Sequence, residues 1–404
     1  MHARTLLTVA ALVAAGALTL TGCVPNAGSG DAVALTVDSG ADTCEVSANT
    51  AASGPITFSV TNSGDQVTEF YVLAENELSI VGEVENIAPG ASRDLTLVAQ
   101  PGDYFTVCKP GMVGEGIGQT PFTVTGESVE ANADDAEAEA AAIASYTSYV
   151  KSQAAELLPQ VEEFVDAYVT GDEAEARRLF PLARVSYERI EPTAEQFGDL
   201  DPSIDYRKPG AEAEGLEFIG FHRIEMDLWL DAAKQNYPDE TIAALTPEER
   251  KTLGDQLVAD ITSLYDLVHS DDFTLTLSDI TNGAIGLLDE IAAPDGKLPG
   301  EENEFSHTDL YDFTANVEGA QVAYESVREI AASKGDDGEK LTSTLDTQFA
   351  AMLELLASYG DYEAGFVDYS TVDQNARNEL GAQLNALSEP LSQLTHTVLG
   401  VSAE

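Results

Sequence analysis

The spacing of the apolar residues changes once along this chain, close to residue 126. Before that point apolar and polar residues alternate in short runs such as VALTV (33–37) and ITFSV (56–60), and turn signals such as the PG pairs at 89 and 101 separate the runs. Alternation with a period of two is typical of half-buried strands, and short strands at this spacing favour a small antiparallel sandwich. Further strand-like runs lie at 70–73, 94–98, 104–107 and 122–124.

The second part of the chain has a helical pattern. The stretch GESVEANADDAEAEAAA at 126–142 is acidic and rich in alanine, which is typical of a linker that runs into a helix start. After it, apolar residues recur at steps of three and four, and residues such as Gly171, Pro181 and Gly300 punctuate the pattern. We therefore expect an all-helical second domain, built as one bundle or a pair of bundles.

The first residues have the character of an export signal. Arg4 precedes an apolar run at 6–20, which is too short for a membrane-spanning helix. The LTGC that ends at Cys23 resembles the bacterial lipobox, in which the cysteine becomes the lipidated first residue of the mature chain. The alternative is ordinary secretion with Cys23 removed. Because no later stretch is long and apolar enough to cross a bilayer, we expect an extracytoplasmic protein that only a lipid anchors to the membrane surface.

These patterns divide the chain into five parts. We predict a lipoprotein signal peptide at 1–22, a tether at 23–31, an all-β domain at 32–126, a linker at 127–139 and an all-α domain at 140–404.

The charge balance is strongly acidic. The chain has 71 Asp and Glu against 19 Lys and Arg, a formal net charge of -52. Such a field repels nucleic acid and attracts cations, so we expect no nucleic-acid partner. Most of these carboxylates serve solubility, and the charge alone locates no site.

The helical part contains a histidine and a glutamate three residues apart. They are His222 and Glu225, in the stretch GFHRIEMDLW at 220–229. On a helix both share one narrow sector with Phe218 and Trp229, so we expect them to face inward. Two interpretations remain open. The pair is either an ordinary buried hydrogen bond or part of a metal site, since this spacing lets both side chains converge on one ion inside a bundle.

Two other stretches could complete such a site. SYERIEP offers Glu188 and Glu191. EFSHTDLYDF offers His307, Asp309 and Asp312. Ser306 followed by Asp309 also fits a capping box, in which Asp309 would only hold a helix start, so His307 is the better ligand candidate. Imidazole and carboxylates suit iron, manganese or zinc rather than Cu(I).

Several blocks of the helical part resemble the imelysin-like family, once classed as peptidases, whose hallmark is an HxxE motif. The blocks are YERIEP, FGDLDPSIDYR, GFHRIEMDLW and FSHTDLYDFTANVEGAQVAYESV, and the resemblance runs from about residue 140 to the end. It implies two helical bundles and metal binding at the HxxE pair, here His222 and Glu225. A metal-dependent peptidase is the alternative function, but the HExxH spacing of zincin-type metallopeptidases is absent from the sequence.

The all-β part contains Cys44 and Cys108. In an exported protein two cysteines are most simply a disulfide, and metal binding is the alternative. Cys108 follows a strand and precedes Met112 by four residues, which resembles the ligand loop of cupredoxins. A blue-copper site also needs two histidines, and none lies between Cys23 and His222, so electron transfer by that route is excluded.

The blocks CE, EFYVL, ENIAPG and GDYFTVC resemble the cupredoxin-like sandwich of a bacterial family of iron-uptake components, which join such a domain to an imelysin-like helical domain in this order. The resemblance implies a second metal site of cysteine and acidic side chains, with zinc or copper as possible ions besides iron. By position its ligands are Cys44, Glu69, Asp103 and Cys108.

The same resemblance implies a function. It describes a lipid-anchored protein that captures iron, as Fe²⁺ or Fe³⁺, and hands it to an iron permease in the membrane, with a haem peroxidase as companion. We expect a binding protein rather than an enzyme. A third alternative, a copper-handling or purely structural lipoprotein, agrees poorly with only 4 methionines and 5 histidines.

Overall fold

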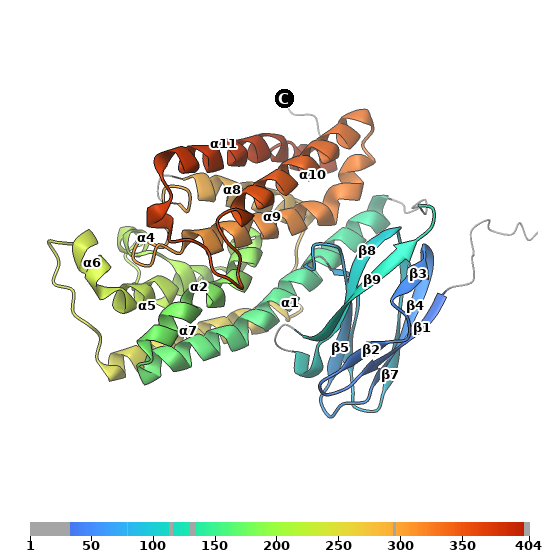
Figure 1. The fold of residues 1–404 in the computed structure, drawn as a ribbon, viewed down its shortest axis with the longest axis horizontal. Helices are drawn as coiled ribbons and strands as arrows, with labels where there is room; N and C mark the ends of the chain where they lie inside the picture. The colour runs from blue at the N-terminus through green and yellow to red at the C-terminus, as the bar shows by residue number, and fades with distance from the viewer. Residues whose placement is uncertain (1–32, 79, 113–115, 129–134, 294–295, 400–404) are drawn as a thin grey trace, which may run out of the picture.

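The computed structural model describes residues 33–78, 80–112, 116–128, 135–293 and 296–399. The predicted signal peptide, the tether and the lipidation site Cys23 lie outside the described residues. Within the described ranges, strands form an N-terminal domain of two sheets and helices form the rest of the chain (Figure 1). Among the described helices, none combines the length and the apolar character that a membrane-spanning segment needs.

The N-terminal domain is built from two facing sheets with a common core. One sheet has the order β2-β1-β4-β7 and the other β3-β9-β8-β5-β6. Inward side chains of both sheets meet in the core, where the Phe58 ring lies 5.3 Å from the Phe70 ring and 5.5 Å from the Phe122 ring. The strands are β1 (Val33–Ser39), β2 (Cys44–Val46), β3 (Thr50–Ala52), β4 (Gly54–Asn62), β5 (Thr68–Leu73), β6 (Ile80–Ile87), β7 (Ser92–Ala99), β8 (Gly102–Cys108) and β9 (Ile117–Thr125).

The sheets are mixed, so the antiparallel prediction is wrong in part. β1 pairs in parallel with β4, and β3 pairs in parallel with β9. Alternation of apolar residues reports which side chains are buried, but it does not report the direction of the neighbouring strand. Three strands also escaped prediction. β2 and β3 are three residues long, too short for a visible pattern, and the alternation of β6 is interrupted by Gly82 and glutamates.

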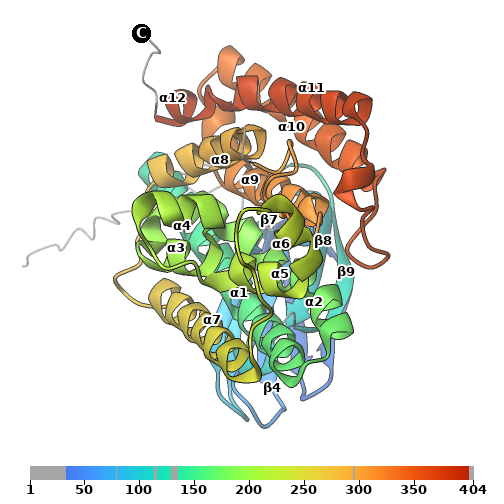
Figure 2. The ribbon, with the colours of Figure 1, turned by 90° about the vertical axis from the view of Figure 1, so that its left-hand side faces the viewer.

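The rest of the described chain is helical, as expected. Its elements are α1 (Asp135–Thr170), α2 (Glu173–Ile190), η2 (Glu191–Phe197), α3 (Leu200–Asp205), α4 (Lys208–Glu214), α5 (Gly220–Leu228), α6 (Leu230–Asn236), α7 (Pro247–Val268), α8 (Leu277–Ala292), α9 (Asp309–Ala332), α10 (Asp336–Ala357), η3 (Tyr369–Thr371), α11 (Gln374–Leu391) and α12 (Leu394–Leu399). In both views α11 lies at one end of this domain and α7 towards the other, with α9 between them (Figures 1 and 2).

Close contact between α2 and α9 defines the interior of the helical domain. Gly319 of α9 lies against the backbone of Arg189 on α2, where a Cβ would overlap the carbonyl oxygen. Pro181, which we expected to interrupt the helical pattern, lies buried inside α2, and the helix continues past it to Ile190. The residues before and after Pro181 therefore belong to one continuous helix, which packs against α9.

The long helix α1 connects the two domains. It begins at Asp135, inside the predicted linker, and its N-terminal half packs on the β5–β6 side of the sheets. The Ser145 hydroxyl donates to the Ile80 carbonyl oxygen at 2.7 Å, and Lys109 Nζ donates to Ser152 Oγ at 2.9 Å. These contacts fix the sheets against one side of the helical domain.

Candidate metal centre

The conformation of Gly220 places the HxxE helix. Gly220 begins α5 with a φ of 76°, a backbone conformation that side chains with a Cβ rarely adopt. A Cβ at this position would also overlap the carbonyl of Ile204 in α3. α5 can therefore start directly beside the end of α3, and this brings His222 next to Asp205.

His222 and Glu225 face inward, which confirms the prediction from helical spacing. Their exposed fractions are 1% and 0%. His222 Nδ1 lies 3.1 Å from one oxygen of Glu225. The other oxygen of Glu225 accepts the backbone N–H groups of Phe305 and Ser306 at 3.2 and 2.8 Å. Both oxygens of Glu225 thus have partners, and Glu225 holds the imidazole by its Nδ1 side.

The second nitrogen of His222 faces two other carboxylates. Nε2 lies 3.5 Å from Glu302 Oε1 and 3.7 Å from Asp205 Oδ1. Among the described residues this buried nitrogen has no hydrogen-bond partner. Asp205, His222 and Glu302 each offer one ligand atom, and these three atoms lie within 4.8 Å of one another. An imidazole nitrogen without a hydrogen bond, beside two buried carboxylates, fits a transition-metal cation such as iron, manganese or zinc.

A second acidic group adjoins the first. Glu188, Glu191 and Asp205 also offer oxygens within 4.8 Å of one another, so Asp205 belongs to both groups. Asn316 of α9 holds the two glutamates together, because its amide donates to Glu188 at 2.9 Å and to Glu191 at 2.7 Å. The three residues come from α2, η2 and the end of α3.

Two buried cations balance part of this negative charge. The Arg184 guanidinium is fully buried and pairs with Asp205, Glu188 and Asp312. The Lys297 ammonium lies 3.3 Å from Glu188, and its side chain is 4% exposed. Buried carboxylates at such density require cationic partners, since an unpaired buried charge is very costly. We call the whole set the acidic cluster. Its members are Arg184, Glu188, Glu191, Asp205, His222, Glu225, Lys297, Glu302, Asp309 and Asp312.

The acidic cluster shifts the titration of its members. Burial and the nearby Arg184 lower the pKa of His222. Neighbouring carboxylates, led by Asp205, outweigh both and raise this pKa to about 9. Burial raises the pKa of Glu302, but Lys297 and His222 reverse this effect and hold it well below its usual range. Burial and the adjacent Glu188 carboxylate raise the pKa of Glu191 well above its usual range. The site without metal is thus a network of paired charges around a protonated imidazole.

The residues proposed from the sequence are only partly brought together. His222, Glu225, Glu188 and Glu191 all lie in the acidic cluster. Asp309 is buried at the start of α9, where its carboxylate accepts the Asn303 N–H at 3.3 Å, and burial raises its pKa to about 7.

His307 is not joined to this network by its side chain. It has a φ of 57° and its imidazole makes no hydrogen bond or ion pair with any described residue of the cluster. The alternative capping box of Ser306 and Asp309 is not formed, because the helix cap is Thr308 and no side-chain cap bond is present there.

Sequence reasoning missed Asp205, Glu302, Arg184 and Lys297. Asp205 lies inside FGDLDPSIDYR, one of the blocks that resemble the imelysin-like family, and Glu302 lies in the acidic run GEENE. Neither carries a spacing signal relative to His222. For Asp205, the signal in the sequence was its position in a block that resembles the family.

The second metal site predicted in the sheet domain is not assembled. Cys44 and Cys108 are joined in a disulfide, with sulfur atoms 2.08 Å apart, so neither sulfur is a thiolate ligand. Glu69 is buried and accepts the Tyr71 hydroxyl. Asp103 is exposed and accepts the Thr123 hydroxyl at 2.9 Å. Of the two alternatives for the cysteines, the structure has the disulfide.

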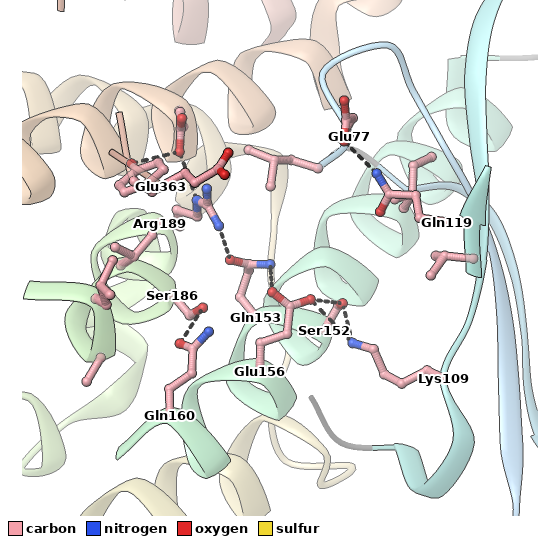
Figure 3. Close-up of a pocket in the computed structure, with 18 of the residues that line it drawn as sticks. Glu77, Lys109, Gln119, Ser152, Gln153, Glu156, Gln160, Ser186, Arg189 and Glu363 are labelled. Atoms are coloured by element: carbon pink, nitrogen blue, oxygen red, sulfur yellow. Dashed lines mark hydrogen bonds and ion pairs between the residues drawn. The ribbon is translucent and has the colours of Figure 1, made fainter. Parts of the chain in front are cut away.

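A separate cavity of about 850 Å³ lies between the two domains (Figure 3). The view shows Lys109 reaching from the sheet domain to Ser152 and Glu156 on α1, with Arg189 of α2 on the opposite wall. Ser186 and Arg189 face this cavity, whereas Arg184 and Glu188 of the same helix belong to the acidic cluster. Helix α2 therefore separates the cavity from the candidate metal centre. The lining carries both signs of charge and does not select a ligand by charge alone.

Comparison with known proteins places the helical part in a family. The family model described as Peptidase_M75: Imelysin matches residues 142–394. This chain belongs to the imelysin family. The resemblance inferred from the sequence blocks is therefore confirmed, and the acidic cluster lies entirely within the matched region.

Relatives of this imelysin-family protein match nearly its whole length. The iron uptake system component EfeO of Escherichia coli O1:K1 / APEC is 34% identical over 365 residues, and that of Yersinia pestis is 35% identical over 360 residues. Each alignment covers 89% of this chain and 89% of the relative. An imelysin-like protein from Psychrobacter arcticum 273-4, of known structure, aligns with a TM-score of 0.47 and 12% identity, over 68% of this chain and 99% of its own.

Proposed function

We propose that this protein is the extracytoplasmic iron-binding component of an iron-uptake system, with Asp205, His222 and Glu302 as the ligands of its cargo ion. The names of its EfeO relatives support the role in iron uptake. The observation that supports the site is Nε2 of His222, which has no hydrogen bond within the described part of the chain and is buried within 3.7 Å of an oxygen from each of two carboxylates. In the metal-free protein this nitrogen is ion-paired with both carboxylates, and the same three atoms lie close enough together to bind one cation once the proton has left the ring.

Glu225 prepares the imidazole for this role. Because its carboxylate accepts two backbone N–H groups on one oxygen, the other oxygen is available to accept the Nδ1–H of His222. In the neutral ring the lone pair then lies on Nε2 and points at Asp205 and Glu302. A carboxylate behind a metal-binding histidine fixes the tautomer and the orientation of the ring. We therefore assign Glu225 an orienting role and the three other side chains the binding role.

The proposal also includes how the protein is anchored and where its iron goes. The sequence resemblance supports a lipid anchor at Cys23, delivery of iron to a membrane permease and a haem peroxidase as a further partner. It also supports a cupredoxin-like sandwich for the sheet domain, whose parallel β1–β4 pair is compatible with a Greek-key arrangement. The negative charge of the chain favours accumulation of cations near its surface.

A metal-dependent peptidase is the alternative from the sequence, and burial argues against it. A peptidase must admit a polypeptide to an open coordination position of its metal. The exposed fractions of His222, Glu302 and Asp205 are only 1%, 6% and 9%. A small ion reaches such a site far more easily than an extended chain does.

The decisive experiment is an anaerobic titration of the purified protein with Fe²⁺, followed by calorimetry and element analysis. We expect one Fe²⁺ per chain at the proposed site and loss of that equivalent in His222→Ala. The matched control is His396→Ala, since His396 is an exposed histidine on α12. Circular dichroism confirms that both variants fold. Unchanged Fe²⁺ binding by folded His222→Ala would refute the proposed site, and cleavage of casein only in the presence of metal would favour the peptidase.

A further inference from the structure

A buried lysine contacts carboxylates from both metal-ligating groups. Lys297 Nζ lies 3.3 Å from Glu188, 3.6 Å from Glu191 and 3.9 Å from Glu302. Glu302 belongs to the group of His222, whereas the other two glutamates belong to the adjacent group. Lysine is almost never fully buried unless it is paired, and here one ammonium serves three carboxylates.

The geometry around Lys297 differs from that of a single tight ion pair. A charge-assisted hydrogen bond from an ammonium to a carboxylate is typically about 2.7–2.9 Å long. All three distances to Lys297 are longer, so the ammonium lies among the oxygens in the manner of a bound cation. One of the three carboxylates, that of Glu302, is a proposed metal ligand, and the other two belong to the adjacent acidic group.

The other buried cation of the cluster is held differently. Arg184 forms close pairs with Asp205 and Glu188, and its Nε donates to Asp312 at 3.1 Å. The guanidinium also lies over the Phe221 ring, 5.3 Å from its centroid. Arg184 is therefore fixed from several sides by its partners on α2, α3 and α9. The Lys297 ammonium instead lies 3.3 Å or more from each of its three carboxylates.

The backbone around Lys297 is anchored independently of its side chain. The Tyr369 hydroxyl donates to the Leu298 carbonyl at 2.5 Å, and Arg377 donates to the Pro299 carbonyl at 2.5 Å. The Leu298 N–H donates to Ile291 of α8 at 3.0 Å. Loss of the ammonium should therefore leave the chain that carries Glu302 in place.

We propose that Lys297 is an internal cation that competes with the cargo metal for Glu302 and for the Glu188–Glu191 pair, and thereby keeps metal binding weak enough for release. This inference rests on the proposed function, because it takes the group of Asp205, His222 and Glu302 as the metal site. A carrier must give up its ion, and repulsion between a nearby ammonium and the ion weakens binding without altering a ligand.

The test replaces Lys297 and measures affinity for Mn²⁺, a redox-stable probe, by calorimetry. Because repulsion acts strongly in a buried site, Lys297→Met should bind Mn²⁺ about tenfold more tightly or better than the wild type, whereas Lys297→Arg should stay close to it. Lys251→Met is the matched control, since it removes the charge of an exposed lysine on α7. A purely structural ion pair would give weaker or unchanged binding in Lys297→Met, and that result overturns the inference.

The charge of the ion provides a second readout. Repulsion is proportional to the charge of the bound ion, so a tenfold gain for Mn²⁺ corresponds to about a thirtyfold gain for Ga³⁺ supplied as its citrate complex. Equal gains for both ions would contradict competition by charge. If Lys297→Met fails to fold, Lys297→Met/Glu191→Gln is compared with Glu191→Gln alone, and the double variant should bind Mn²⁺ more tightly.

The outcomes separate this inference from the proposed function. Wild-type binding that depends on His222 but is not tightened by Lys297→Met overturns the role of Lys297 alone. Absence of Mn²⁺ binding in the wild type and in every lysine variant overturns both. If Mn²⁺ binds only to Lys297→Met and not to the wild type, the lysine competes strongly enough to prevent Mn²⁺ binding, which supports the inference.

Discussion

Gly220 lies with its α-carbon against the carbonyl oxygen of Ile204, the residue that precedes Asp205. This contact joins the start of α5 to the end of α3, and it sets the 3.7 Å separation between His222 Nε2 and Asp205 Oδ1. The positive φ of Gly220 and the absence of a Cβ are both required for it. Glycine is therefore required at position 220, directly before the HxxE motif, by the backbone conformation and by the close approach of Ile204.

Gly220→Ala should weaken the metal centre and the fold together. The new Cβ would overlap the Ile204 carbonyl, so α5 must shift, and we expect a loss of roughly 3 kcal/mol or more in the free energy of unfolding. Urea denaturation measures it. The control is Gly215→Ala, which also has a positive φ, 70°, but has open space around the added Cβ. Its expected cost is about 1 kcal/mol, from the backbone conformation alone. Equal costs for the two variants would exclude the role of the Ile204 contact.

Glu302 should matter more for metal binding than His307. Glu302→Gln keeps the shape of the side chain but removes a charged ligand, so we expect Fe²⁺ affinity to fall on the order of a hundredfold. His307→Ala should change it by less than about threefold, because the imidazole makes no hydrogen bond or ion pair with the described residues of the cluster. Anaerobic calorimetry on both variants checks this ranking. The reverse order would return His307 to the ligand set.

The sequence was sufficient for the motif but not for its partners. Helical spacing correctly placed His222 and Glu225 on one inward face, because neighbours three apart share a sector whatever the tertiary fold. It could not show that Glu225 holds Nδ1 while Asp205 and Glu302 face Nε2. Those two residues come from other segments, and only the packing of α3 and of the chain before α9 brings them to His222.

The same limit applies to the sheet domain. The alternation in β1 and β4 identified both as strands, yet their parallel pairing depends on the path of the chain between them. The sequence also does not decide the role of the two cysteines. Cys44 and Cys108 fit either a disulfide or a metal site in the sequence, and only the 2.08 Å contact of their sulfurs decides between the two.

The stability of the metal-free protein should depend on pH through His222. The pKa of His222 is about 9 in the folded protein, and about 6.5 is typical of an unfolded chain, so the folded state holds this proton more tightly. The stabilisation is complete below pH 6.5 and is lost as the pH rises through 9. Between these values we expect the free energy of unfolding to fall on the order of 3 kcal/mol from this group.

Urea denaturation in the presence of a chelator, at pH 6 and at pH 9.5, measures this change. His222→Gln should show a smaller fall than the wild type, whereas His396→Gln should behave like the wild type because His396 is exposed. If His222→Gln loses as much stability as the wild type, other groups cause the pH dependence.

Removal of the disulfide should weaken the sheet domain and leave metal binding intact. Cys44 and Cys108 are 64 residues apart in the sequence, and closing a loop of that length stabilises a fold by about 4 kcal/mol in the chain-entropy model. Cys44→Ser/Cys108→Ser should therefore lower the urea midpoint of the sheet domain by that free energy, while the Fe²⁺ stoichiometry of the protein stays the same. The helical domain contributes every proposed ligand, so its binding does not require the bridge. A loss of bound Fe²⁺ in the folded double variant would show that the sheet domain contributes to the metal site.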